Sequence, residues 1–587
     1  MARALAGTME EPAKAGELAS LQAGARVAWV QRAADDLFVA WNDARDIFLL
    51  FHGRDFDLEE KECAIRARGS SCQTQAECLV RCYEAEGEEI ILRLNGRFSG
   101  VIIDRRADRV LLFNDRFGAS RVHVHATADG LWFASDAAAL LAALPATRRI
   151  DPRGLGEFFS LGCVMQNRTL FAGIMLLPPG SLWSLHADGR VEKRRYFSPE
   201  AWEQQPQLAP EEFCAQLTEL FAKIVPRYRR GPGQAGMSMT GGLDSRMVLA
   251  WAGAKPGELP CYTFGGPYRD CADVRIGRRL SKLACQPHHI IPVVPGFFSQ
   301  FLELAERTVA VSGGTMDVSG SVELHANRLA RKIAPVRLTG NYGSEVLRAN
   351  IAFRPRAHDP ALFTPEFFPH LASAAETYRN ESAGHRLSFI AFKQVPWHHH
   401  ARLAIEAAVL EPRSPFLDNA LVALAYRTPF GWERSPVPAL RATAAGNADF
   451  AAVSTDRAVR LRPVPVLGAI EHCWQEFTAK AEYAWDYGMP QALVRATRPF
   501  QAWHVERVFL GRHKFYHFRS WYRDELSSHL GSLNLEFDRL PPCYAAEKPR
   551  RLVEAHTTGS ENRTLDLHRM LTLHFINRQL AAPPCRN

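Results

Sequence analysis

A glycine turn flanked by two small hydroxyl residues carries the clearest chemical signal in this chain. Residues 237–250 read Met-Ser-Met-Thr-Gly-Gly-Leu-Asp-Ser-Arg-Met-Val-Leu-Ala, a pattern that predicts a strand, a tight turn and the start of a helix. Glycines let backbone N–H groups approach an anion without a Cβ in the way, and a helix start adds free donors and the positive end of its dipole. Because the hydroxyls of Thr240 and Ser245 could donate to the same anion, the turn predicts a phosphate site.

Asp244 indicates that a metal ion accompanies the anion. A carboxylate would repel bare pyrophosphate, whereas a hard cation such as magnesium takes carboxylate oxygens as ligands. The segment lacks the Gly-Lys-Ser/Thr ending of a Walker P-loop, so it is a different kind of phosphate loop. We therefore interpret 240–245 as a pyrophosphate and magnesium site; the alternative is an ordinary glycine turn before a helix.

The elements around this turn alternate between strand and helix. Strands are predicted at 235–239, 261–264, 289–294 and 336–339, and helices at 211–225, 243–252, 272–284 and 297–311. Such alternation implies a parallel sheet that binds its ligand at the carboxyl ends of the strands. A second glycine turn at 340–343, followed by Glu345, then lies at the same edge as the first turn.

The part before this alternation is rich in short strands. Strands are predicted at 90–94, 99–103 and 110–114, and helices at 77–83, 136–144 and 151–161. A strand-rich layer with helices packed on it is the simplest arrangement. A polar linker is expected at 200–210, and the chain beyond about 461 is expected to be helical and rich in aromatic residues.

Composition narrows the class of protein. A chain of 587 residues is too long for a single core, and 47% hydrophobic with 23% charged residues is typical of globular proteins. The net charge of +8 is scattered rather than clustered, so no nucleic-acid partner is expected. No apolar run reaches the length of a membrane span, and residues 1–20 lack the apolar centre of a signal peptide. We therefore expect a cytoplasmic protein without a membrane partner.

The two halves together resemble the asparagine synthetase family. That family joins an N-terminal class II glutamine amidotransferase domain to a C-terminal ATP-pyrophosphatase synthetase domain. The matching blocks are 94–98, 114–118, 133–136, 170–174, 177–180, 240–245, 273–289, 339–345 and 411–418.

The resemblance implies an α/β fold in several parts. A flexible tail at 1–25 would precede a degenerate Ntn-hydrolase-like αββα sandwich at 26–200. An adenine-nucleotide α-hydrolase-like parallel-sheet domain would follow at 211–460, and a helical C-terminal extension at 461–587.

The first domain departs from the family at its reactive residues. A class II amidotransferase uses an N-terminal cysteine whose own α-amine acts as the base, whereas here Ala2 follows the initiator and the first cysteine is Cys63. The Asn-Gly pair of the family corresponds to His52-Gly53, and the aspartate of its glutamine pocket corresponds to Gln75. We expect a structural remnant without glutaminase activity. A wrongly chosen start codon, the alternative, would restore a cysteine but not the pocket.

The second domain keeps the residues that the family uses for its chemistry. The resemblance implies that ATP and its pyrophosphate are bound by Met239, Thr240, Gly241, Gly242, Asp244, Ser245, Phe264, Thr339 and Gly340. Asp244 and Glu345 would hold Mg²⁺, with Ser344 in place of the other acid of the family's pair. Asp273 would support the loop or the metal, or be a charge on a helix surface.

The second glycine turn suggests the nature of the nucleophile. Family members without glutaminase activity include β-lactam synthetase, which places a tyrosine in this turn that works with a glutamate to deprotonate an amine. Either Asn341 or Tyr342 could take that position, and we favour Tyr342, with Glu345 as the second catalytic residue. Glu376 or Glu381 could be the glutamate partner; the alternative is that Tyr342 is a packing aromatic.

Charge on the departing pyrophosphate calls for a cation besides magnesium. The family uses a lysine in the region after its Pro-Phe-Leu-Asp run. In this chain that region offers Arg441 or Arg457 instead, and the sequence does not distinguish them.

These features predict an AMP-forming, ATP-dependent C–N ligase with ATP and Mg²⁺ as cofactors. It would adenylate the carboxylate of a small molecule or peptide and couple it to an amine, as in natural-product biosynthesis; lasso-peptide cyclases are one candidate class. One alternative is amidation by ammonia or glutamine, as in asparagine synthetase itself, and another is an inactive nucleotide-binding scaffold. A homodimer is one option for the assembly.

Overall fold

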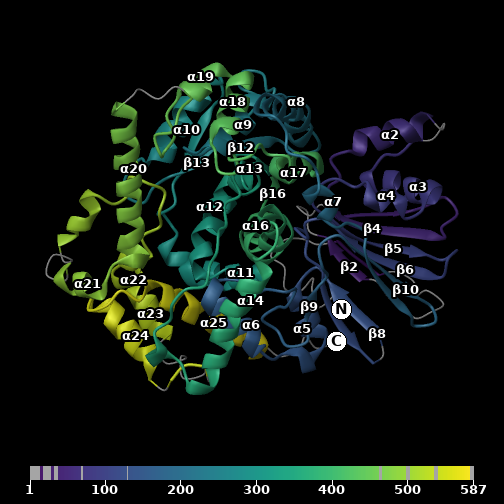
Figure 1. Ribbon diagram of the computed structural model, residues 1–587. Helices are drawn as coiled ribbons and strands as arrows, with labels where there is room; N and C mark the ends of the chain where they lie inside the picture. The colour runs from purple at the N-terminus through teal and green to yellow at the C-terminus, as the bar shows by residue number, and fades with distance from the viewer. Residues whose placement is uncertain are drawn as a thin grey trace.

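The computed structural model describes residues 14–17, 28–31, 37–67, 71–128, 130–461, 466–497, 503–533, 540–541, 543–545 and 547–581. Within them the chain forms an antiparallel N-terminal part, a central part built on a parallel sheet, and a group of C-terminal helices (Figure 1). No helix among the described residues is long and apolar enough to cross a membrane.

Two antiparallel sheets form the centre of the N-terminal part. The larger has six strands in the order β11-β10-β6-β5-β4-β3, and the smaller has three in the order β8-β7-β9. The strands are β3 Leu37–Trp41, β4 Ile47–Gly53, β5 Phe98–Asp104, β6 Arg109–Asn114, β7 His123–Thr127, β8 Gly130–Ala134, β9 Met175–Leu176, β10 Ser181–His186 and β11 Val191–Arg195. A separate antiparallel pair consists of β1 (Lys14–Glu17) and β2 (Ala28–Gln31).

The alternation of side chains along β5 explains how these sheets are layered. Ile102 belongs to a core shared with the helices on one face, whereas Val101 and Ile103 belong to a core shared with Val124 of the smaller sheet. Successive residues of a strand point to opposite faces, so β5 is buried on both sides.

Helices complete the two outer layers of this part. The helices are α2 Leu58–Ala67, α3 Gln75–Glu86, α4 Glu89–Leu92, α5 Ala137–Ala143 and α6 Pro152–Leu161. The first three cover the larger sheet, and α5 packs on β7 and β8. The order of helix, sheet, sheet and helix is the αββα sandwich that was predicted, so this part of the fold class is confirmed.

The strand predicted at 90–94 is wrong. The segment forms the short helix α4 and a turn, and both Ile90 and Ile91 are buried in the core that α3 also lines. Two adjacent isoleucines in so short an apolar run do not distinguish a helix from a strand.

The central part is built on a five-stranded parallel sheet in the order β14-β13-β12-β15-β16. The strands are β12 Ala235–Ser238, β13 Cys261–Phe264, β14 His288–Ile291, β15 Val336–Leu338 and β16 Glu411–Arg413. The chain leaves β12 toward β13 on one side and returns to β15 on the other, so the strand order reverses at β12. Ligands of open parallel sheets bind at such a switch point, outside the carboxyl ends of the strands. The parallel sheet confirms the second part of the predicted fold class.

Helices cover both faces of this sheet. They include α8 Pro210–Arg229, α9 Leu243–Trp251, α10 Ala272–Leu283, α11 Phe301–Ser312, α12 Ser321–Arg331, α13 Gly343–Arg348, α16 His400–Ala407, α17 Asn419–Ala425, α18 Val437–Gly446 and α19 Ala448–Ala452. Met237 and Leu338 face a core shared with α8, α9 and α18, and Tyr262 and Phe264 face a core shared with α11 and α12. Helix α14 (Phe368–Glu381), the short α15 (Arg386–Phe389) and a π-helical segment (Ile390–His399) lie before α16.

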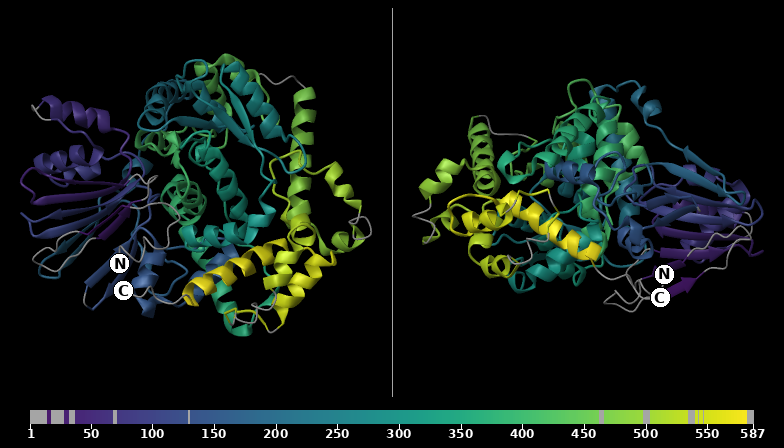
Figure 2. Two further views of the ribbon diagram at one scale, coloured as in Figure 1. Left: turned by 180° about the vertical axis from the view of Figure 1, so that it is seen from behind. Right: turned by 90° about the horizontal axis from the view of Figure 1, so that it is seen from below.

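The C-terminal helices join the other two parts. They are α20 Leu467–Tyr483, α21 Gln491–Thr497, α22 Phe518–Arg523, α23 Ser527–Leu533, α24 Lys548–Thr557 and α25 Thr564–Ala581. Trp521 and Met570 share one core with Phe159 of the N-terminal part and Phe301 of the central part. Figure 1 shows α22 to α25 below the central sheet, with α20 and α21 at the outer edge, and Figure 2 gives two further views. This helical C-terminal region also agrees with the predicted fold class.

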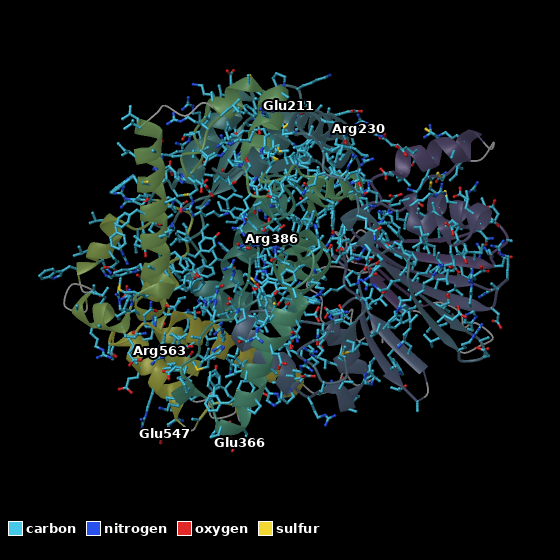
Figure 3. The ribbon with its side chains drawn as sticks, viewed as in Figure 1. Glu211, Arg230, Glu366, Arg386, Glu547 and Arg563 are labelled. Carbon is cyan, nitrogen blue, oxygen red and sulfur yellow. The ribbon has the colours of Figure 1, made fainter. Side chains whose placement is uncertain are left out.

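Side chains fill the spaces that separate the ribbons (Figure 3). Arg230, on the side of the central part that faces the N-terminal part, forms an exposed ion pair with Glu59 at 3.4 Å. Arg563 lies among the C-terminal helices and pairs with Asp359 at 3.1 Å. The C-terminal helices are therefore tied by charge as well as by apolar contact.

Candidate active site

The glycine turn lies at the carboxyl edge of the parallel sheet, between β12 and α9. The hydroxyls of Thr240 and Ser245 are 3.0 Å apart, and the Gly242 N–H donates to Thr240 Oγ1 at 3.3 Å. The second turn runs directly beside the first, because a Cβ on Gly340 would lie 2.5 Å from the backbone nitrogen of Ser245. Only glycine permits this approach, so the two turns form one continuous surface.

This surface lines a cavity of about 150 Å³. Seven of the nine residues expected to bind ATP line it, namely Thr240, Gly242, Asp244, Ser245, Phe264, Thr339 and Gly340. Met239 is buried beneath the turn. The Gly241 N–H donates to Asp273 Oδ1 at 2.8 Å, so Asp273 supports the loop.

Three cations and, besides Asp244, two further carboxylates line the same cavity. Arg337 pairs with Glu406 at 3.3 Å, and Arg402 pairs with Glu323 at 3.0 Å. The third cation is Lys514, and its Nζ lies 4.6 Å from the centre of the Phe264 ring. Each arginine thus has a carboxylate partner in the cavity wall.

Lys514 is the cation without such a partner. Within the described part of the chain its ammonium forms no ion pair with a carboxylate. Burial lowers the pKa of Lys514, while the charges of Asp273 and Glu323 act in the opposite direction. A partly buried ammonium that faces a cavity and forms no carboxylate ion pair is suited to an anionic ligand.

Lys514 was not among the candidates drawn from the sequence. Arg441 packs over Trp432 and lies 3.8 Å from Glu211, a residue at the top of the molecule in Figure 3. Arg457 lines a neighbouring cavity and also pairs with Glu476 at 3.5 Å. The one signal for Lys514 was that it is the only lysine in the arginine- and histidine-rich segment 501–523.

The neighbouring cavity has a volume of about 440 Å³. It shares Glu323, Arg402 and Lys514 with the cavity at the turns, so the two adjoin. Asp273 and Asp456 face it from the side of the glycine turn. Burial, with a further contribution from the charge of Asp273, raises the pKa of Asp456 to about 6.

The two residues expected to hold magnesium lie close together. The charge of Glu345 contributes to raising the pKa of Asp244, although burial is the larger cause and Arg348 opposes it. Arg348 Nη2 donates to both carboxylate oxygens of Asp244, at 2.9 and 2.8 Å. Glu345 accepts from Ser344 Oγ at 2.8 Å and lies 3.4 Å from His399 Nε2.

Both carboxylates are therefore already engaged by protein groups. No cluster of three or more potential metal-ligating His, Cys, Asp or Glu side chains occurs among the described residues. A magnesium ion at this place would take Asp244 and Glu345 together with phosphate and water oxygens, which is how the ion is commonly bound in nucleotide sites. Arg348 would have to yield one or both oxygens of Asp244.

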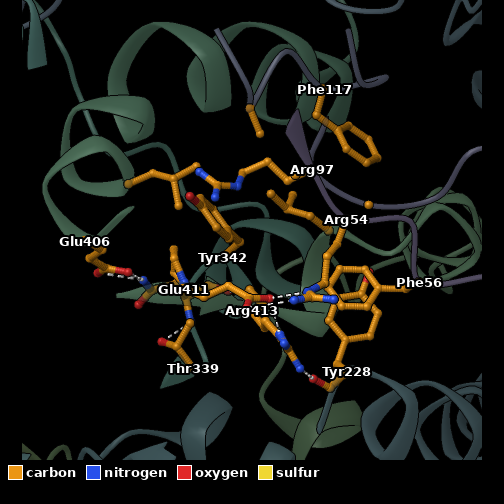
Figure 4. Close-up of a pocket in the computed structure, with 18 residues that line it drawn as sticks. Arg54, Phe56, Arg97, Phe117, Tyr228, Thr339, Tyr342, Glu406, Glu411 and Arg413 are labelled. Atoms are coloured by element: carbon orange, nitrogen blue, oxygen red, sulfur yellow. Dashed lines mark hydrogen bonds and ion pairs between the residues drawn. The ribbon is translucent and has the colours of Figure 1, made fainter. Parts of the chain in front are cut away.

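Tyr342 lies on the other side of the second turn. It has a left-handed backbone with φ 71°. Its ring centre lies 5.5 Å from the ring centre of His399, and the two rings are nearly perpendicular. It lines a separate cavity of about 40 Å³ between the N-terminal and central parts, where it points toward Arg97 (Figure 4). Burial, the largest cause, raises the pKa of Tyr342, and the charge of Glu406 adds to this.

The glutamate near this turn is Glu406. Asn341 Nδ2 donates to its carboxylate at 3.2 Å, and Glu406 lines both the interdomain cavity and the cavity at the glycine turn. Glu381 pairs with Lys393 at 2.9 Å instead, and Glu376 is exposed. In the described structure neither residue contacts Tyr342.

Charged side chains fill much of the boundary between the two parts. Glu411 accepts from Arg54 and from Arg413, each at 2.5 Å (Figure 4). Phe56 stacks on Tyr228 with ring centres 3.7 Å apart. These contacts tie β16 and α8 of the central part to the N-terminal sheet.

The residues that correspond to a glutamine pocket are engaged within the fold. The buried Gln75 side chain donates to the Gly53 carbonyl and accepts from the Asp55 N–H, each at 3.0 Å. His52 Nδ1 lies 3.4 Å from Ser120 Oγ. Cys63, the first cysteine, is an exposed residue on α2.

Comparison with known proteins gives a domain class for the first part and a partial similarity to asparagine synthetases. A glutamine amidotransferase domain model matches residues 25–197. Asparagine synthetase [glutamine-hydrolyzing] 3 of Bacillus subtilis (strain 168) is 25% identical over 228 residues, which cover 38% of this chain and 37% of that protein. Asparagine synthetase [glutamine-hydrolyzing] 1 of the same organism is 22% identical, covering 39% and 36%. The chain is therefore similar in part to asparagine synthetases, and its first part carries a glutamine amidotransferase-like domain.

Other matches agree, with limited coverage. Asparagine synthetase [glutamine-hydrolyzing] of Zea mays is 22% identical over 258 residues, covering 42% of this chain and 39% of that protein. The alignments thus span well under half the length of these relatives. A solved structure of glutamine phosphoribosylpyrophosphate amidotransferase from B. subtilis with ADP and GMP is 11% identical over 45% of this chain and 49% of that one, with a TM-score of 0.19. That superposition is too loose to bear on the fold.

Proposed function

We propose that this protein is an ATP-dependent ligase that adenylates a carboxylate and couples it to an amine. The observation that carries the proposal is the cavity at the carboxyl edge of the sheet, where two glycine turns, Asp244 and the ammonium of Lys514 converge. Similarity to asparagine synthetases supports the same reaction class.

The first step releases pyrophosphate. A carboxylate oxygen of the substrate attacks the α-phosphorus of ATP, the bond from that phosphorus to the bridging oxygen breaks, and pyrophosphate leaves with the electron pair. The hydroxyls of Thr240 and Ser245 and the N-terminus of α9 face the leaving group. Lys514 supplies the additional positive charge that the departing anion requires.

Magnesium fits the carboxylates of Asp244 and Glu345, since both are hard oxygen ligands next to the turn. When bound, it neutralises charge on the phosphates. The chain's own contribution is to hold the two carboxylates near each other and to provide Arg348 as the counter-charge of Asp244 when the ion is away.

The second step forms the amide. The amine nitrogen attacks the acyl carbon, the bond to the AMP oxygen breaks, and a proton leaves the nitrogen. Glu406 is better placed than Tyr342 to receive this proton, because its carboxylate lines the cavity at the turns while Tyr342 lines only the interdomain cavity. Tyr342 then shapes the turn that carries Asn341 and its bond to Glu406.

The amine belongs to a substrate rather than to glutamine. Gln75 occupies hydrogen-bonding groups of Gly53 and Asp55 where the family holds glutamine. The interdomain boundary is filled by the Glu411 ion pairs. With purified protein, glutamine should therefore yield no glutamate above the rate in buffer, and steady glutamate release would refute this part of the proposal.

Binding of ATP tests the proposal directly. Calorimetry with ATP and Mg²⁺, followed by a pyrophosphate-release screen over carboxylate and amine pairs, should show binding and then turnover. Asp244→Asn should lower both by about two orders of magnitude or more. Asp449→Asn, an exposed acid in the first turn of α19, is the matched control and should behave as wild type. Failure of wild-type protein to bind ATP in the presence of magnesium would refute the ligase.

A further inference from the structure

Helix α20 presents an apolar stripe to solvent. Leu467, Ile470, Trp474 and Phe477 follow the three-and-four spacing of one helix face, and their exposed fractions are 66%, 62%, 53% and 64%. Figures 1 and 2 show this helix at the outer edge of the molecule. Among the described residues, ten of the seventeen exposed large apolar side chains lie between Val466 and Val508.

An adjacent face of the same helix is anchored to the protein. Thr478 Oγ1 lies 2.9 Å from His513 Nε2, and the Glu482 carboxylate accepts from the backbone N–H groups of Arg512 and His513. Helix α20 is thus held in place by polar contacts on one side. The apolar stripe on the exposed side is not needed to hold the helix in a single copy of the protein.

We propose that this stripe, defined as Leu467, Ile470, Trp474 and Phe477, is a dimer interface that binds the same stripe of a second copy. The stripe is self-complementary when two helices run antiparallel across a two-fold axis. Its first half is aliphatic and its second half is aromatic, so Leu467 meets Phe477 of the partner subunit and Ile470 meets Trp474 of the partner subunit. Isologous contacts of this kind are the commonest in homo-oligomers, and a/d spacing favours helix pairing.

The area available is at the lower end of what a specific interface needs. With roughly 100 to 150 Å² exposed on each side chain, the stripe offers about 500 Å² per copy and about 1,000 Å² for the pair. An apolar patch of that size on a monomer usually marks an interaction site.

The charges beside the stripe favour a protein partner over a membrane. Helices that lie on membranes carry lysine and arginine on their polar face. Here the flanks carry Glu471, which pairs with Arg460, and Glu476, which pairs with Lys480. This balance gives no attraction to anionic lipid but leaves two copies free to approach.

The interface would also affect the active site. The segment that α20 holds through Glu482 and Thr478 continues directly into Lys514. Pairing of two α20 helices would therefore stabilise the wall that carries this ammonium. The dimer itself is independent of the proposed reaction, because it requires neither ATP nor substrate.

Sedimentation velocity and a thiol cross-link test the proposal. Wild-type protein should sediment as a dimer at micromolar concentration, and the double variant Ile470→Glu, Phe477→Glu should dissociate at least 100-fold more readily. Cys473 is exposed and lies between Ile470 and Trp474, next to the proposed axis. A short bis-maleimide should therefore yield a covalent dimer that Cys473→Ala abolishes, although Cys63 and Cys285 are also exposed.

Phe430→Glu is the matched control. Phe430 is 87% exposed and lies outside the stripe, so its replacement should leave the dimer intact. Circular dichroism tests whether each variant is folded. If the double variant does not fold, cross-linking of wild-type protein at Cys473 still decides whether the stripe forms the dimer. Wild-type protein that stays monomeric, a dimer that the double variant retains, or a monomer that binds anionic vesicles would each overturn the proposal.

Discussion

Replacing Lys514 with methionine separates a functional charge from a structural one. The side chain is partly buried against the Phe264 ring, and its ammonium forms no carboxylate ion pair in the described structure. Methionine keeps most of the apolar length and removes the charge. Lys514→Met should therefore preserve the packing of the cavity wall while removing the cation that faces the glycine turn.

We expect Lys514→Met to lose much of its activity and none of its stability. Removing one group that stabilises a leaving anion costs about 3 kcal/mol, or roughly 10² to 10³ in kcat. Removing a partly buried charge that has no ion-pair partner lifts a desolvation penalty, so the thermal midpoint should stay level or rise. Pyrophosphate release by Lys514→Met should thus fall steeply in kcat, while differential scanning fluorimetry shows no destabilisation.

The pH dependence of stability gives an independent check. Since burial lowers the pKa of Lys514 below its usual 10.5, the unfolded chain binds more protons than the folded protein just below pH 10.5. Stability of the wild type should rise with pH in that window, and Lys514→Met should lose this rise. Near-normal turnover by Lys514→Met, or a loss of activity that only follows a fall in thermal midpoint, would refute the assigned role.

Two further predictions concern acids beside the turn. Arg348→Ala removes the partner of both Asp244 oxygens. Without magnesium the variant should be less stable than wild type, and addition of Mg²⁺ should raise its thermal midpoint more than that of wild type. Calorimetry that shows weaker Mg²⁺ binding by the variant would contradict this. Asp456 has a pKa raised from 3.8 to about 6, so the folded protein binds more protons than the unfolded chain between those values and stability should fall as pH rises through them. Asp456→Asn should remove that fall and be more stable than wild type above about pH 6; an unchanged pH profile in fluorimetry would show that Asp456 does not titrate there.

The parts of the fold that the sequence made visible are those set by short-range patterns. The turn at 240–245 was readable because glycine conformation, small hydroxyls and a helix start all act within a few residues. The strand at 261–264 was found with the bounds that the structure shows, since an apolar run between turn signals is typical of a buried strand. At 90–94 the same rule failed, because a short run of apolar residues also suits a buried helix.

The parts of the candidate site that the sequence did not reveal depend on contacts between distant segments. Arg348, Glu406 and Lys514 reach the cavity region from three different elements, and each has a side chain that is unremarkable in its local sequence. Arg441 and Arg457 were reasonable candidates by position, yet only the packing of α18 and of the loop after α19 shows where they point. Local patterns locate the phosphate turn, but they do not show which distant charges complete it.

The charge balance of the cavity indicates why the C-terminal helices are part of the site. Arg337 and Arg402 are offset by Glu406 and Glu323, so they add little net charge. Within the turn, the Gly241 N–H is already used by Asp273. An anion that leaves from this place therefore depends on Lys514, which α20 positions through the neighbouring backbone. The parallel sheet supplies the shape of the site, and the C-terminal region supplies its excess positive charge.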